Sequence, residues 1–159
     1  MVAAIDGDCL SVGLELALAA DIRLTTPASR FGLPDLGAGR LPCWGGTQRL
    51  PRVVGVAKST SMLLLGEIIH ASEAAEAGLV HDVSDDLDAA VDSVVEALLA
   101  VGPLAVELAK EAVHRGAELP LRDGLRLEGD LNTLLQSTDD RAEGLAAFFA
   151  KRPPDFAGR

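Results

Sequence analysis

Aromatic residues and cysteines are scarce in this sequence, and each shortage excludes a class of protein. The 159 residues include no tyrosine, four phenylalanines and one tryptophan, so the core must consist mainly of Ala, Leu and Val. Proteins that stack single-stranded bases depend on aromatic side chains that are largely missing here. The two cysteines, Cys9 and Cys43, are too few for a disulfide scaffold, and no Cys-X-X-Cys or His cluster indicates a zinc site. We therefore expect no metal.

Basic charge and long hydrophobic runs are also lacking. The chain has 14 basic and 24 acidic side chains, a net charge of −10, whereas a nucleic-acid interface needs a basic face. No apolar run reaches the roughly 18 residues of a membrane span, and the N-terminus lacks the basic flank and apolar stretch of a signal peptide. With 48% hydrophobic residues, the sequence is typical of one folded cytoplasmic domain with no nucleic-acid or membrane partner.

The hydrophobic pattern predicts a mixed α/β start followed by a helical remainder. Residues 2–5, 22–26 and 79–83 are short and largely apolar, which predicts strands. Because residues 2–5 are apolar throughout, we expect this strand to lie between two neighbours in a covered sheet. With so few companion strands, the sequence resembles the second part of a fold whose first part is absent. Apolar residues at helical spacing, with Gly and Pro boundaries, predict helices at 56–65, 72–77, 87–100, 103–116, 121–136 and 139–151.

Two carboxylates lie in settings that suit chemistry but also have ordinary structural explanations. Glu15 is in the first turn of a helix predicted from residue 11, where unpaired main-chain N–H groups attract negative charge. It could act at a site or only stabilise the helix dipole. Asp35 follows Pro34, whose ring fixes the backbone, but Asp after Pro is also common in turns. Spacing alone leaves both interpretations open.

Residues 41–52 form a third segment of interest, containing a Gly pair, a cysteine and the tryptophan. Gly45 and Gly46 allow close approach of the backbone, and Thr47 could cap a helix. The segment lacks the Gly-X4-Gly-Lys-Ser/Thr pattern of a phosphate-binding loop. Cys43 is a poor candidate for a nucleophile, because the three histidines are all distant from it in sequence.

Taken in order, these segments resemble the enoyl-CoA hydratase/isomerase family, also called the crotonase superfamily. The resemblance implies an α/β fold, a crotonase-like partial ββα spiral core with a helical C-terminal region. Residues 1–100 would form the C-terminal part of the spiral core, and residues 101–159 a helical region for oligomerisation and for covering the active site. A homo-oligomer, a trimer or a hexamer, is expected. The matching segments are 4–7, 15–23, 31–35, 42–50, 66–67, 74–80, 137–148 and 151–156.

The resemblance also implies acyl-CoA chemistry through an enolate. Members of the family stabilise the enolate of an acyl-CoA thioester with two main-chain N–H groups, an oxyanion hole, and the N–H of Val12 matches one of them. Glu15 and Asp35 match the acid/base pair that handles the attacking water and the α-proton. Coenzyme A is part of the substrate, so no separate cofactor is expected. The positions that match substrate-binding ones are Gly39, Pro42, Cys43, Trp44 and Lys151.

The sequence departs from the family pattern in several places. The family's chain extends beyond the point that matches Met1, and that N-terminal part supplies the other oxyanion donor. Asp35 is one methylene shorter than the usual glutamate, and Val12 places a branched side chain where the thioester would pass. Trp44 would fill the acyl pocket, stack on a flat acyl group, or be an ordinary core residue.

The leading hypothesis is therefore an enzyme of the enoyl-CoA hydratase or isomerase type. One alternative is a non-catalytic or degraded crotonase-like protein that binds acyl-CoA or forms oligomers. Another is one half of a split enzyme. Near the C-terminus, Phe148 and Phe149 are predicted to be core residues, and Lys151 matches a basic position near the CoA phosphates or is simply an exposed lysine at a helix end.

Overall fold

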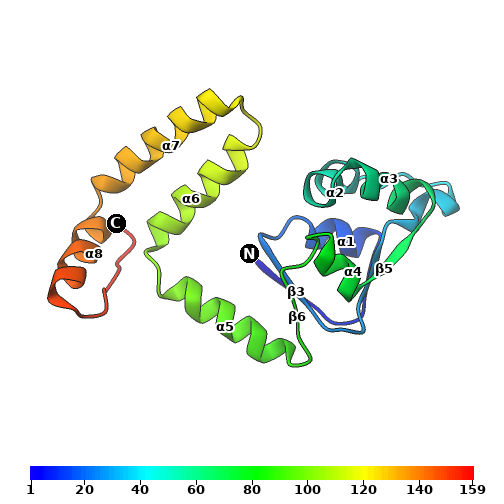
Figure 1. Cartoon of the computed structure of the whole chain (residues 1–159), viewed down its shortest axis with the longest axis horizontal. Helices are drawn as coiled ribbons and strands as arrows, with labels where there is room; N and C mark the ends of the chain where they lie inside the picture. Colours follow the sequence, from blue (N-terminus) through cyan, green and yellow to red (C-terminus); the bar gives the residue numbers. More distant parts are fainter. The chain divides into compact units, whose positions relative to one another are not determined.

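The N-terminal part of the chain contains two small sheets (Figure 1). The first is entirely parallel, and its strands lie in the order β1-β3-β6, which are Val2–Ile5, Ile22–Thr25 and Asp82–Val83. The strands predicted at residues 2–5 and 22–26 are thereby confirmed. Within this chain β1 pairs with β3 alone, so the second neighbour expected for residues 2–5 does not come from these 159 residues.

The predicted strand at 79–83 is shorter than expected. Only Asp82 and Val83 form β6, because the N–H of Leu79 donates to the carbonyl of Ala74 at 2.8 Å and so closes the preceding helix. The second sheet was not anticipated by the periodicity. In it a central strand pairs in parallel with one neighbour and antiparallel with the other, in the order β2-β4-β5, which are Asp8–Leu10, Arg30–Gly32 and Ile68–His70.

The helices between the strands of these sheets largely follow the predictions, with one correction. Residues 41–52 contain the start of a regular helix, α2, and Gly45 rather than Thr47 is its N-cap. Gly45 has a φ of 101°, a conformation that suits glycine and turns the chain into the helix. The elements in this part are α1 (Val12–Ala17), η1 (Pro34–Ala38, a 3-10 helix), α2 (Gly46–Val54), α3 (Val56–Leu64) and α4 (Ala71–Glu76).

The chain folds as two compact units, Met1–Ser93 and Val94–Arg159, and all residues from 1 to 159 are described by this computed structural model. The first unit has an apolar core in which Phe31, Leu14 and Met62 are completely buried. Arg23 is buried against this core and connects strand β3 to the end of α1 and to the segment that follows α4 by hydrogen bonds. Its Nε donates to the carbonyl of Leu79 at 2.6 Å, its Nη1 donates to main-chain carbonyls near the end of α1, and burial lowers its pKa.

The second unit is helical, as predicted, and buries few apolar side chains. It contains α6 (Pro103–Gly116), α7 (Leu121–Gln136) and α8 (Asp139–Ala150), while α5 (Leu87–Leu99) spans the boundary between the units. Figure 1 shows α6 and α7 side by side, and the two helices contact each other. No single helix is long and apolar enough to cross a membrane, and only α5 and α6 taken as one bent pair have that length and composition.

The prediction that Phe148 and Phe149 are core residues is wrong. Their side chains are 77% and 78% exposed and contact each other edge to face, with ring centroids 5.7 Å apart. The buried polar residue of this unit is Asp140, whose Oδ1 accepts hydrogen bonds from the N–H groups of Ala157 at 2.7 Å and Gly158 at 3.1 Å. The C-terminal segment is thereby fastened to the start of α8.

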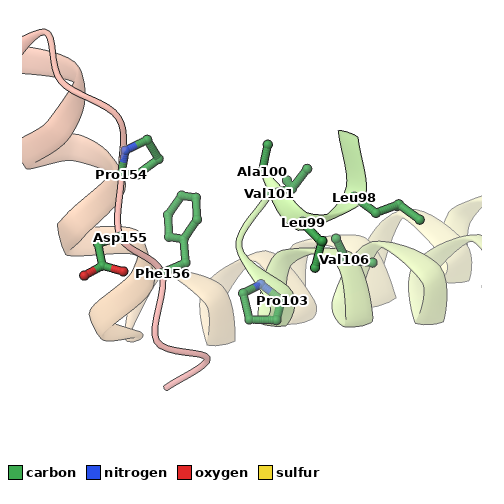
Figure 2. Close-up of a pocket in the computed structure, with 9 residues that line it drawn as sticks. All are labelled: Leu98, Leu99, Ala100, Val101, Pro103, Val106, Pro154, Asp155 and Phe156. Carbon is green, nitrogen blue, oxygen red and sulfur yellow. The ribbon is translucent and has the colours of Figure 1, made fainter. Parts of the chain in front are cut away.

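This C-terminal segment borders a cavity of about 480 Å³ in the second unit. Figure 2 shows Phe156 and its neighbours on one side of the cavity, and the end of α5 with the start of α6 on the other. The lining is mostly apolar, and Asp155 is its only charged residue. No residue of the predicted site lines this cavity.

Candidate active site

Glu15 is positioned by a tight turn between strand β2 and helix α1. Ser11, the N-cap of α1, has a φ of 49°, and its N–H donates to the carbonyl of Gly32 at 3.0 Å, which anchors the turn on strand β4. Few non-glycine residues adopt a positive φ, so this turn is under constraint. Val12 follows directly in the first turn of α1, where main-chain N–H groups have no partner within the helix.

The carboxylate of Glu15 is buried and held by the backbone of the loop before α2. Its Oε1 accepts hydrogen bonds from the N–H of Trp44 at 2.8 Å and the N–H of Gly46 at 2.7 Å, and the residue is only 1% exposed. A Cβ at position 46 would lie 2.9 Å from the Cγ and Oε1 of Glu15 and 3.0 Å from Leu33. A side chain at position 46 would therefore force Glu15 to move away from this loop.

The loop that holds Glu15 is itself fixed by Arg49. The guanidinium of Arg49 donates from Nη1 to the carbonyl of Trp44 at 2.7 Å. Trp44 is therefore held on both sides, by Glu15 at its N–H and by Arg49 at its carbonyl. Trp44 itself is 62% exposed, which excludes the interpretation of this residue as part of the core. Cys43 is a free, exposed thiol, and the structure pairs it with none of the histidines.

Asp35 lies in the 3-10 helix η1 and is also buried. Its Oδ1 is 3.5 Å from the Nη2 of Arg40, and its Oδ2 is the one buried side-chain oxygen or nitrogen of the chain without a hydrogen-bond partner. Most buried polar atoms in proteins are hydrogen-bonded, so the unpartnered carboxylate oxygen of Asp35 calls for an explanation. Pro34 starts η1 directly before Asp35 and restricts the backbone there.

The two carboxylates come from segments that meet at one place. Leu33, two residues before Asp35, and Glu15 both lie next to Gly46, because each would be within about 3 Å of a Cβ at that position. The site therefore combines the start of α1, the segment from Leu33 to Asp35 and the start of α2. Val12 shares the first turn of α1 with Glu15, and Trp44 donates to Glu15 directly.

Other predicted site residues lie elsewhere or have a structural role. Gly39 ends η1 with a φ of 69°, and Pro42 is buried in the loop that follows. Lys151 ends α8 in the second unit with an exposed side chain. No group of three or more His, Cys, Asp or Glu side chains is arranged to hold a metal ion. Sequence reasoning missed Arg40, for which the only signal was a Gly-Arg pair shortly after Asp35.

The whole chain matches one family of known proteins. The family model for enoyl-CoA hydratase/isomerase covers residues 1–159, and the chain belongs to this family. It is 44% identical over 162 residues to 2,3-dehydroadipyl-CoA hydratase of Escherichia coli (strain K12), a match that covers 100% of this chain and 63% of that protein. It is 36% identical over 161 residues to crotonyl-CoA hydratase of Syntrophomonas wolfei, with 100% and 62% covered. The chain thus spans less than two thirds of the length of these relatives.

Solved structures confirm the predicted α/β, crotonase-like fold. The crystal structure of enoyl-CoA hydratase from Bacillus anthracis matches with a TM-score of 0.96 at 39% identity, covering 99% of this chain and 62% of that one. An enoyl-CoA hydratase/isomerase from Cupriavidus metallidurans matches with a TM-score of 0.90 at 30% identity, covering 99% and 60%.

Proposed function

We propose that the protein is an enzyme of the hydratase/isomerase type that acts on an enoyl-CoA thioester. The observation that carries this proposal is the buried carboxylate of Glu15, one oxygen of which is held by two main-chain N–H groups at 2.7 and 2.8 Å. A group fixed in this way needs little reorganisation when the reaction begins. Both of these hydrogen bonds go to Oε1, and we assign the other oxygen, Oε2, to the water molecule or the substrate.

In the hydration that we propose, the oxygen of a water molecule bonds to the β carbon while Glu15 accepts a proton from that water. The electron pair of the double bond moves onto the thioester oxygen, and the N–H of Val12 is one donor to the resulting enolate. Asp35, which enters this step as the neutral carboxylic acid, then delivers its proton to the α carbon through Oδ2, its unpartnered oxygen. The elements of water are added across the double bond, and exchange with solvent resets both carboxyl groups.

The same groups also serve isomerisation of the double bond, where a proton leaves one carbon and returns to another. In that reaction one carboxylate is enough, and the enolate is again the intermediate that the N–H of Val12 stabilises. Glu15 is the better placed of the two for this step, because its position is fixed by the N–H groups of both Trp44 and Gly46.

The names of the relatives support a substrate class rather than one acyl group. They include hydratases of 2,3-dehydroadipyl-CoA, crotonyl-CoA and methylglutaconyl-CoA, which share only the enoyl-CoA thioester. For this chain we propose that Trp44 contacts the acyl group, because it is exposed and its own N–H donates to Glu15. Gly39, Pro42 and Cys43 shape the same loop, and Lys151 is proposed to contact the CoA phosphates.

A homo-oligomer, a trimer or a hexamer, is part of the same proposal. The helices α7 and α8 carry large apolar side chains that are exposed, a pattern typical of surfaces that become covered by another molecule. The residues concerned are Leu121, Leu125, Leu134, Leu145, Phe148 and Phe149. Light scattering after size exclusion measures the oligomeric state directly, and a monomer at all concentrations would contradict it.

The test of the proposed function is hydration of a short trans-2-enoyl-CoA in D₂O by the purified protein. The expected result is loss of the conjugated enoyl absorbance and incorporation of one deuterium at the α carbon of a 3-hydroxyacyl-CoA product. Calorimetric titration with the corresponding saturated acyl-CoA is done in parallel. Binding without hydration or exchange would overturn the proposal and support a non-catalytic acyl-CoA-binding protein instead.

A further inference from the structure

Arg40 contacts Asp35 through both its main chain and its side chain. The N–H of Arg40 donates to the carbonyl of Asp35 at 3.1 Å, and its Nη2 lies 3.5 Å from Oδ1 of the same residue. We propose that Arg40 is a positioning residue that orients the carboxylate of Asp35 for catalysis. This inference rests on the proposed function, because it assigns Arg40 a role in the acid/base chemistry of that site.

The turn that brings Arg40 back to Asp35 is a helix C-cap closed by two hydrogen bonds. Besides the bond from Arg40 to Asp35, the N–H of Gly39 donates to the carbonyl of Leu36 at 2.9 Å, and Gly39 has a φ of 69°. These are the two bonds and the left-handed glycine of a Schellman motif. Because the motif fixes the backbone of residues 35–40, the guanidinium starts from a defined place beside the carboxylate.

The other basic side chains in the same part of the sequence interact with groups other than Asp35. The segment from residue 36 to 66 contains Arg40, Arg49, Arg52 and Lys58 and no acidic residue. Arg49 and Arg52 donate to the main-chain carbonyls of Trp44 and Gln48, and Lys58 pairs with Glu67 and Glu73. Arg40 is therefore the one basic side chain that the structure pairs with Asp35.

The pairing distinguishes the two oxygens of Asp35. Arg40 faces Oδ1, whereas Oδ2 is buried and has no partner. The aspartate is thus presented with one oxygen engaged and the other available to the substrate. The side chain of Arg40 is 70% exposed, so the free protein gains little energy from this ion pair. With Oδ1 turned towards Arg40, the transferable proton is carried on Oδ2, so the effect of Arg40 appears in the catalytic step.

The test uses the variants Arg40→Met and Arg40→Lys in enoyl-CoA hydration. We expect Arg40→Met to lower kcat by about 10-fold with little change in KM, since a misoriented catalytic group slows the chemical step. Arg40→Lys keeps the positive charge and should recover most of the rate. Arg126→Met is the matched control, because Arg126 and Asp123 form an ion pair at the same 3.5 Å distance on α7.

A double-mutant cycle with Asp35→Asn shows whether Arg40 acts through Asp35. We expect Arg40→Met to have no further effect on kcat in the Asp35→Asn background. An equal loss in both backgrounds, or a rise in KM alone, would contradict the inference and indicate direct substrate contact or a general structural role. If Asp35→Asn is slow but Arg40→Met is as fast as the wild type, only this inference fails. A wild-type protein without hydration or exchange overturns the proposed function itself.

Discussion

The two units of the chain use their apolar residues in opposite ways. In Met1–Ser93 the large side chains form a closed core, and Phe31, Leu14 and Met62 are fully buried. In Val94–Arg159 the buried apolar residues are Leu131 and Ala147, while many larger side chains of its helices are exposed. The first unit therefore owes its fold to its own interior, whereas the second presents apolar faces that suit further contacts.

The same difference bears on where the proposed chemistry lies. Glu15 and Asp35 are both buried in the first unit, where a packed surrounding fixes their orientation. In the second unit the buried carboxylate, Asp140, is fully engaged by main-chain N–H groups and fastens the C-terminal segment. Under the proposed function, the buried carboxyl groups of the first unit act on a ligand, whereas Asp140 in the second unit stabilises the fold.

The largest expected effect on stability comes from comparing a phenylalanine of the first unit with one of the second. Phe31→Ala leaves a cavity in the core of the first unit and should lower the free energy of unfolding by about 3–5 kcal/mol. Phe149→Ala removes a ring that is 78% exposed and should change it by less than about 0.5 kcal/mol in the monomer. Urea unfolding followed by circular dichroism measures both. Equal losses would contradict the contrast between a closed core and an open helical surface.

Glycine-to-alanine substitutions in the two units provide a second comparison of their packing. Gly46→Ala places a Cβ 2.9 Å from the carboxylate of Glu15, which must then move. We expect a loss of about 1–3 kcal/mol in stability from overpacking, together with a large loss of hydration activity. Gly129→Ala in α7 meets nothing within 4 Å and should stabilise the helix by about 0.5–1 kcal/mol. An active Gly46→Ala variant would show that the contact with Glu15 is dispensable.

The carboxylate of Asp140 offers a smaller test within the second unit. Asp140→Asn keeps one acceptor but removes the charge, so we expect a loss of about 1 kcal/mol and faster amide hydrogen exchange at Ala157 and Gly158. Asp130→Asn, at an exposed position on α7, should leave the exchange of these two amides unchanged. Unaltered exchange in Asp140→Asn would mean that other contacts hold the C-terminal segment.

The smallest effect concerns pH. Arg152 holds both oxygens of Glu143, at 2.5 and 2.8 Å, and with the N–H of Asp155 it lowers the pKa of this carboxyl from 4.5 to about 2. A carboxyl with a lowered pKa in the folded state stabilises that state above its unfolded pKa, and the contribution is lost as the pH falls from 4.5 towards 2.

Unfolding of the wild type and of Glu143→Gln at pH 7, 4 and 3 measures this contribution. We expect a modest difference at pH 7, since the ion pair is partly solvated, and a smaller one at each lower pH. A difference that grows on acidification would contradict the assigned pKa shift.

The elements that could be predicted are those whose pattern repeats over several turns. The helices α6 and α7 were predicted at their observed bounds, because apolar spacing and flanking Pro or Gly define them locally. Strands β2, β4 and β5 have only three residues each, and pairing with distant segments rather than local pattern specifies them. For α2, the Gly pair and Pro51 are typical of loops, so the sequence did not predict the full length of the helix. The helix continues through Pro51 although proline cannot donate a main-chain hydrogen bond.

The site could be predicted only in part for a related reason. Glu15 and Asp35 were named through the resemblance, while their surroundings depend on three-dimensional contacts. The hydrogen bonds from Trp44 and Gly46 to Glu15 join residues about thirty positions apart in the chain. Arg40 reaches Asp35 only because Gly39 adopts a left-handed conformation, which no periodicity signals. The exposure of Phe148 could not be seen either, because apolar spacing does not distinguish a core from an uncovered helix face.

The central claim is that the buried carboxylate of Glu15 performs the chemistry, and the most direct measurement is the hydration rate of Glu15→Gln. The variant keeps the size of the side chain and an acceptor oxygen for Trp44 and Gly46. We predict that kcat falls on the order of 10²–10⁴-fold while affinity for a saturated acyl-CoA is retained. Glu76→Gln, at an exposed position on α4, is the control and should be fully active. Hydration by Glu15→Gln at a rate near that of the control would contradict the account.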